Sequence, residues 1–181
     1  MMPLNRLIMT GLFAALSGVL AQLLIPLPFT PVPITLQTLA PMLAGLLLGP
    51  RYGALSQVVY LALGLAGAPV FAGGQGGPGV LLGPTGGYLV GHVAGAWLTG
   101  RLAAGSWGRP LLRFVAAAVA GGIAAIYAVG VPWLAVVADL PAGAALAAGA
   151  LPFLPGDIIK AAAAALLAQR LAHALPDLPP A

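Results

Sequence analysis

Residues 52–100, YGALSQVVYLALGLAGAPVFAGGQGGPGVLLGPTGGYLVGHVAGAWLTG, contain no Asp, Glu, Lys or Arg, and this uncharged run decides the fold class. Residues 7–50 form a second run without a charged side chain. Because a helix needs about 20 apolar residues to cross a bilayer, each run is long enough for two spans and a turn. The sequence therefore predicts an all-α integral membrane protein.

The composition of the chain excludes several other classes. Of its 181 residues, 61% are hydrophobic and 6% are charged, whereas a soluble domain is about 25% charged. A β-barrel requires alternating polar and apolar segments, which are absent here. The positive side chains are scattered singly, so the net charge does not indicate nucleic-acid binding. With no cysteine, disulfides and Cys-based metal sites are excluded, and we expect no metal.

Pro, Gly and charged residues divide the chain into six expected transmembrane helices, which we expect to form a single domain over residues 1–181. Their approximate ranges are 7–25, 35–49, 52–68, 85–104, 111–131 and 153–172. With the N-terminus in the cytoplasm, this map places all but one of the positive residues on the inner side, as the positive-inside rule requires. These residues are Arg6, Arg51, Arg101, Arg109, Arg113 and Arg170. The even number of spans then predicts that both termini are cytoplasmic.

Two charged residues lie inside the last expected span. Asp157 and Lys160 are three residues apart, so they share one face of a helix. An unpaired charge inside a bilayer costs several kcal/mol, so intramembrane ionisable residues indicate a functional site. Two interpretations stay open. The residues form a private ion pair that closes the helix end, or the carboxylate accepts N–H donors of a substrate while the ammonium meets an anion.

Further polar and glycine-rich segments are expected on the outer side. Thr35, Gln37 and Thr38 begin the second helix, at the depth of the charged pair. Tyr88 begins the fourth helix and Tyr127 lies near the end of the fifth, at the same depth. The loop of residues 69–84 contains Gly73, Gly74 and Gln75. Glycine lets a backbone approach a ligand closely, although a flexible connector has the same composition. The loop lacks the Gly-Lys-Ser/Thr ending of a P-loop, so we expect no ATP hydrolysis by that route.

Small residues recur along two expected helices. Gly87, Gly91 and Gly95 follow one another every four residues, which lets a second backbone approach closely. The first helix carries one stripe of Thr10, Ala14 and Gly18 and an adjacent one of Gly11 and Ala15. Such stripes indicate packing within the bundle or, alternatively, a docking face for another protein.

Three segments together resemble a known family. They are PVPITLQT (31–38), PVFAGG (69–74) with GPTGGY (83–88), and PFLPGDIIK (152–160). In this order they are similar to the BioY biotin transporter proteins, the substrate-binding S components of energy-coupling factor transporters. The resemblance covers nearly the whole chain and implies a six-helix bundle that captures biotin from outside the cell membrane. Asp157 then accepts the ureido N–H groups, and Lys160 pairs with the carboxylate.

The resemblance also implies partners. In such systems the S component docks to a transmembrane T component through small residues of its first helix, here Gly11, Ala14, Ala15 and Gly18. Two cytoplasmic ATPase subunits use the ATP, so we expect no cofactor in this chain. The expected location is the inner (plasma) membrane, in contact with lipid. Family members often carry an asparagine in the loop that here contains Gly73, Gly74 and Gln75.

Two alternatives belong to other functional classes. The chain is a self-sufficient secondary transporter of a small organic anion or another vitamin, or it is a membrane enzyme in which Asp157 and His92 act as acid and base. The enzyme requires both residues at one depth. The helix map places His92 about two turns inward from the outer end of its helix, and we interpret it as a packing or hydrogen-bonding residue.

Overall fold

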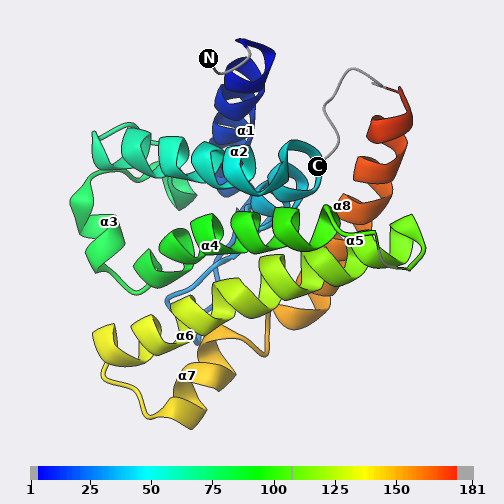
Figure 1. Cartoon of the computed structure of the whole chain (residues 1–181). Helices are drawn as coiled ribbons and strands as arrows, with labels where there is room; N and C mark the ends of the chain where they lie inside the picture. Colours follow the sequence, from blue (N-terminus) through cyan, green and yellow to red (C-terminus); the bar gives the residue numbers. More distant parts are fainter. Residues whose placement is uncertain (1–3, 107, 175–181) are drawn as a thin grey trace.

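The computed structural model describes residues 4–106 and 108–174 and is mostly helical (Figure 1). Its long helices are α1, α2, α4, α5, α6 and α8, with short helices α3 and α7 in the connections. A two-stranded antiparallel sheet pairs Leu24 with Thr35 and Ile25 with Ile34. In chain order the elements are α1 (Leu4–Gln22), β1 (Leu24–Ile25), β2 (Ile34–Thr35), α2 (Leu39–Leu65), η1 (Ala72–Gly74), α3 (Pro78–Leu82), α4 (Gly86–Ala103), α5 (Pro110–Val119), η2 (Ala120–Ala125), α6 (Ile126–Val137), α7 (Ala142–Gly149) and α8 (Leu154–Ala174).

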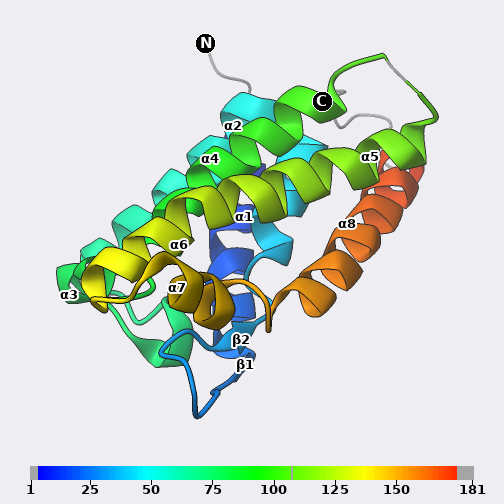
Figure 2. The same cartoon turned by 90° about the horizontal axis from the view of Figure 1, so that it is seen from below.

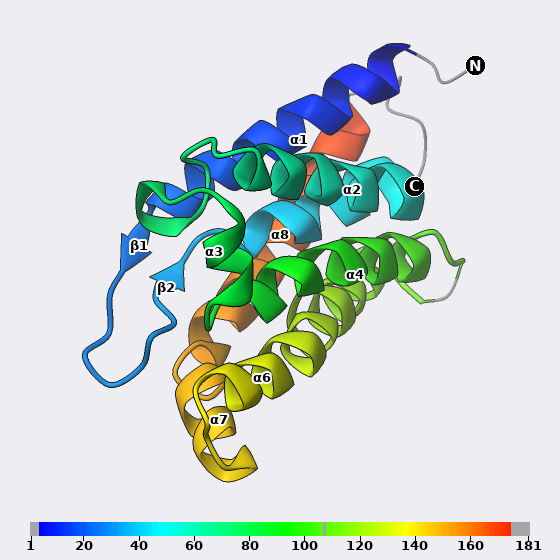
Figure 3. The same cartoon turned by 90° about the vertical axis from the view of Figure 1, so that its left-hand side faces the viewer.

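The element α2 consists of two legs that fold back on each other. Gly49 has φ 75° and ψ −178°, outside the helical region, and Pro50 follows it. A Cβ on Gly53 would lie 3.0 Å from the backbone of Ala44, so the chain reverses here (Figure 3). The two legs correspond to the predicted helices 35–49 and 52–68. The first leg begins at Leu39, because Thr35 belongs to β2 and its hydroxyl accepts the Gln37 N–H at 3.2 Å.

The segments α5, η2 and α6 form one continuous helical stretch, of which η2 is π-helical. The predicted end at residue 131 is wrong, since the stretch continues through Pro132 to Val137. A proline removes one backbone hydrogen bond, but neighbouring groups in a membrane bundle make this loss tolerable. The short α7 lies in the connection between α6 and α8, where the sequence predicted no helix.

The glycine stripe of α4 packs within the bundle. A Cβ on Gly91 would lie 2.9 Å from the Ile126 carbonyl oxygen, and one on Gly95 would lie 2.8 Å from the Gly121 carbonyl oxygen. A Cβ on Gly87 would overlap the side chain of Trp133. The missing side chains therefore let α4 approach η2 and α6 at backbone distance, as Figure 2 shows. Of the two interpretations of this stripe, packing is confirmed.

Length and apolarity single out few of these helices as spans. Within the described residues, α1 and the stretch Pro110–Val137 are long and apolar enough to cross a membrane alone, and α7 with α8, bent by 52°, adds a third if counted as one span. The two legs of α2 and the 18-residue α4 are shorter than the about 20 residues that a bilayer requires. Within the described residues, six helical segments nevertheless form one bundle, in agreement with the predicted number. They are α1, the two legs of α2, α4, the stretch Pro110–Val137 and α8.

The arginine-bearing connections lie together. The first described turn of α1, the Gly49 turn of α2 and the end of α8 point to the same end of the bundle (Figure 3). The guanidinium carbon of Arg6 lies 5.1 Å from the centroid of the Tyr52 ring, next to Arg51. The strands, α3 and α7 lie toward the opposite end, and the polar residues predicted to bind substrate lie toward that end as well.

Candidate substrate-binding site

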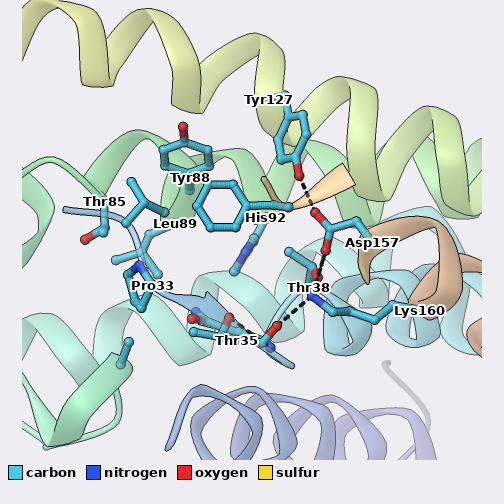
Figure 4. A pocket seen from close by; sticks show the side chains of 14 residues that line it. Pro33, Thr35, Thr38, Thr85, Tyr88, Leu89, His92, Tyr127, Asp157 and Lys160 are labelled. Carbon is cyan, nitrogen blue, oxygen red and sulfur yellow. Dashed lines mark hydrogen bonds and ion pairs between the residues drawn. The ribbon is translucent and has the colours of Figure 1, made fainter. Parts of the chain in front are cut away.

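A small cavity opens between the β-hairpin and helices α2, α4, α6 and α8. Its volume is about 70 Å³, roughly that of a few water molecules. Five of the eight residues predicted to bind substrate line it, and Figure 4 shows the charged ones at one end. These five are Thr35, Gln37, Tyr88, Asp157 and Lys160. The sequence motifs that contain them are far apart in the chain and meet here.

The charged pair at this end is held by a dense set of hydrogen bonds. Lys160 Nζ donates to Asp157 Oδ1 at 2.7 Å, to the Thr35 carbonyl oxygen at 2.6 Å and to Thr38 Oγ1 at 3.2 Å. The Thr38 hydroxyl donates to Asp157 Oδ1 at 2.9 Å, and the Tyr127 hydroxyl donates to Asp157 Oδ2. Asp157 is 1% exposed and Lys160 is 9% exposed. Helices α2, α6 and α8 are thus joined at one carboxylate.

The two charged groups differ in their remaining capacity. An ammonium group has three donors, and all three of Lys160 have oxygen acceptors. A carboxylate has about four acceptor positions, and Asp157 uses three of them. Lys160 therefore has no free donor for a ligand, whereas the carboxylate of Asp157 keeps a free acceptor position on Oδ2. The ion pair of the first alternative is present, and binding of a substrate by either group stays a prediction.

The other wall of the cavity is held by an anchored loop. Gln37 Nε2 donates to the Tyr60 hydroxyl at 2.9 Å, which in turn donates to the Val70 carbonyl oxygen at 3.1 Å. The next residue, Phe71, is fully buried, and its ring meets that of Tyr60 edge to face with centroids 5.5 Å apart. Its ring fills the space left by Gly64, where a Cβ would overlap it. The glycine-rich loop is therefore fixed to the bundle at its start.

A second cavity of about 260 Å³ adjoins the first, because Pro33, Ala72 and Thr85 line both. Gly73 and Gln75 of the predicted site line this second cavity. Gly74 is not among its lining residues; its N–H donates to Gln22 Oε1 of α1 at 2.8 Å. The other seven predicted residues are thus divided between two adjoining cavities, and Gly74 makes a structural contact with α1.

Several residues that line the first cavity were not among the predicted site residues. The polar ones are Thr38, Thr85, His92 and Tyr127. A signal for His92 was present, since residues four apart share a helix face and Tyr88 was already assigned to the site. His92 lies nearly two turns into α4 (Gly86–Ala103), as the helix map predicted, and it lines the same cavity as Asp157.

The predicted docking residues of α1 face two directions. Ala14 and Gly18 are buried, and a Cβ on Gly18 would lie 3.4 Å from Val70 Cβ. Gly11 and Ala15 are exposed, and a Cβ on Gly11 would meet nothing within 4 Å. The chain itself therefore covers Ala14 and Gly18, which pack within the bundle, and docking through the first helix stays a prediction.

The fold and the cavity together define a helical membrane protein with a small, buried cavity that contains a charged pair. The sequence model of the BioY family matches residues 1–177, and the chain belongs to this family. It is 43% identical over 185 residues to the biotin transporter BioY of Rhizobium etli, covering 98% of each chain. It is also 43% identical over 169 residues to the biotin transporter BioY of Thermotoga maritima, covering 93% of this chain and 96% of the other.

The fold also matches a solved structure. This is the crystal structure of the S-component for biotin from an ECF-type ABC transporter, with a TM-score of 0.85, 34% sequence identity and coverage of 94% of each chain. The match confirms the predicted all-α membrane fold. Since the curated relatives are named as transporters, the chain is a membrane transport protein and not an enzyme.

Proposed function

We propose that this chain is the biotin-capturing S component of an ATP-driven vitamin importer. The observation that carries the proposal is the buried carboxylate of Asp157, which keeps a free acceptor position where it lines the cavity. An ionisable group in an apolar bundle requires a function, and a ureido group offers the N–H donors that this position accepts. The names of the relatives and of the matching structure support the same ligand.

The ligand is oriented by the two cavities. The ureido head lies in the first cavity, with an N–H on Asp157, and the valerate chain extends past Pro33 and Ala72 into the second cavity. There, the side chains of Thr30 and Gln75 supply polar contacts for the carboxylate. Because every N–H of Lys160 already has an acceptor, its role in this mode is to neutralise and orient Asp157. Pairing of Lys160 with the ligand carboxylate would require one of these bonds to break.

Asp157 is 1% exposed and Lys160 is 9% exposed, so a ligand that reaches them requires a wall of the cavity to move aside. Only two residue pairs, Leu24 with Thr35 and Ile25 with Ile34, join the strands of the β-hairpin that forms one wall. Short hairpins of this kind are marginally stable in isolation. Movement of the hairpin therefore admits the ligand from the outer end of the bundle.

Partners and location follow from the same proposal. The arginine-bearing end lies in the cytoplasm, as the positive-inside rule predicts, and the membrane is the inner (plasma) membrane. Docking to a transmembrane T component uses the exposed small residues Gly11 and Ala15 of α1. Two cytoplasmic ATPases bound to that component supply the energy.

Biotin titration by calorimetry on detergent-purified protein tests the site. We expect Asp157→Asn and Lys160→Met each to weaken binding at least about tenfold, since each breaks a buried charge pair. Asp139→Asn, at an exposed position of the outer connection, is the matched control and should bind normally. Unchanged affinity in both site variants refutes the assignment.

Biotin methyl ester distinguishes the two roles of Lys160. If Lys160 orients Asp157, Lys160→Met weakens the ester and the free acid by the same factor. If Lys160 pairs with the ligand carboxylate, Lys160→Met weakens binding of the free acid but leaves binding of the ester unchanged.

The alternative of a self-sufficient secondary transporter is tested in liposomes that contain this chain alone. Proton-coupled biotin uptake supports that alternative, whereas strict dependence on the ATPase partners supports an S component.

A further inference from the structure

His92 is a buried polar residue of the cavity with no assigned task. It lies on α4 one turn after Tyr88, is 3% exposed and lines the cavity together with Asp157 (Figure 4). Its Nδ1 atom is shielded from solvent and has no hydrogen-bond partner among the residues that the structure describes. Buried polar atoms in native proteins are almost always paired, so an exception requires an explanation.

Position separates His92 from the other unpartnered polar atoms. Thr99 Oγ1 and Arg113 Nε also lack a partner among the described residues. Neither residue is among those that line the cavity, whereas His92 lies in its wall. A buried nitrogen without a partner destabilises the protein, and a hydrogen bond from a bound ligand removes this destabilisation.

We infer that His92 forms a hydrogen bond with the ureido group of bound biotin, next to the N–H group held by Asp157. This inference rests on the proposed function. Asp157 and His92 line the same cavity, so a ureido group held by Asp157 is placed against the wall to which His92 belongs. A neutral imidazole has one N–H donor and one acceptor, and a ureido group offers both a carbonyl oxygen and N–H groups. His92 thereby adds recognition of the head group that Asp157 alone does not supply.

Biotin titration of three variants tests this bond. We expect His92→Phe, which keeps a planar ring without polar atoms, to bind about tenfold more weakly. Asn places a polar atom near the position of Nδ1 and Gln near that of Nε2, so His92→Asn or His92→Gln should restore most of the affinity. Restoration by either amide supports a hydrogen bond and identifies the nitrogen that makes it.

Two results overturn the inference while leaving the proposed function in place. His92→Phe binds biotin as tightly as the unmodified protein, or neither amide recovers affinity, in which case His92 acts through its shape. If the unmodified protein itself binds no biotin, the proposed function fails and this inference fails with it.

Biotin methyl ester and thermal unfolding complete the test. His92→Phe should weaken the ester and the free acid by the same factor, and a loss confined to the free acid contradicts contact with the ureido group. Without ligand, His92→Phe should unfold at the same or a higher temperature, because the unpaired nitrogen has been removed. A residue that only supports the fold would instead lower this temperature.

Discussion

The charged pair of α8 predicts an unusual pattern of stability. In Lys160→Met, the Asp157 carboxylate keeps the Tyr127 and Thr38 hydroxyl donors but loses its countercharge at 1% exposure. In Asp157→Asn, the Lys160 ammonium keeps two neutral oxygen acceptors and loses its countercharge. Removing one partner of a buried pair costs about 3–5 kcal/mol. The double variant leaves no unpaired charge, so it should cost no more than the more damaging single change.

Reversible unfolding in mixed micelles, with sodium dodecyl sulfate as denaturant and tryptophan fluorescence as the signal, measures these free energies. The three tryptophans of the chain supply that signal. The reasoning is refuted if each single change costs less than about 1 kcal/mol, the value of an exposed pair, or if the double change costs the sum of the two. Biotin is absent throughout, so the result does not depend on the proposed function.

Two further predictions concern the loop and the orientation. Gly64→Ala should destabilise the protein by about 1–3 kcal/mol and weaken biotin binding, because its Cβ overlaps the ring of Phe71 that anchors the loop; Gly79→Ala, with nothing within 4 Å, is the control, and equal thermal midpoints would contradict this role of Phe71. In this cysteine-free chain, an impermeant maleimide should label Gly143→Cys on intact cells and Ser106→Cys only after lysis, and the reverse pattern contradicts the proposed orientation.

Much of the site was predictable because its chemistry is rare in this chain. Asp157 and Lys160 stand out since charges inside a span are costly, and Thr35, Gln37 and Tyr88 lie in motifs beside prolines and glycines. The structure brings these five residues to one cavity. All three donors of Lys160 have acceptors, whereas Asp157 keeps one free acceptor position. This difference depends on hydrogen bonds between distant segments, so the sequence does not predict it.

The sequence by itself determined that this protein is a helical membrane protein, which ends of its helices share a side, and which charges require partners. Length, hydropathy and arginine placement carry this information, because the bilayer imposes them on each segment separately. Only the tertiary structure decided that Ala14 and Gly18 face inward, and that His92 and Tyr127 reach the cavity. In a bilayer the lipid-facing and core-facing sides of a helix are both apolar, so its rotation about its own axis is set by packing against its neighbours.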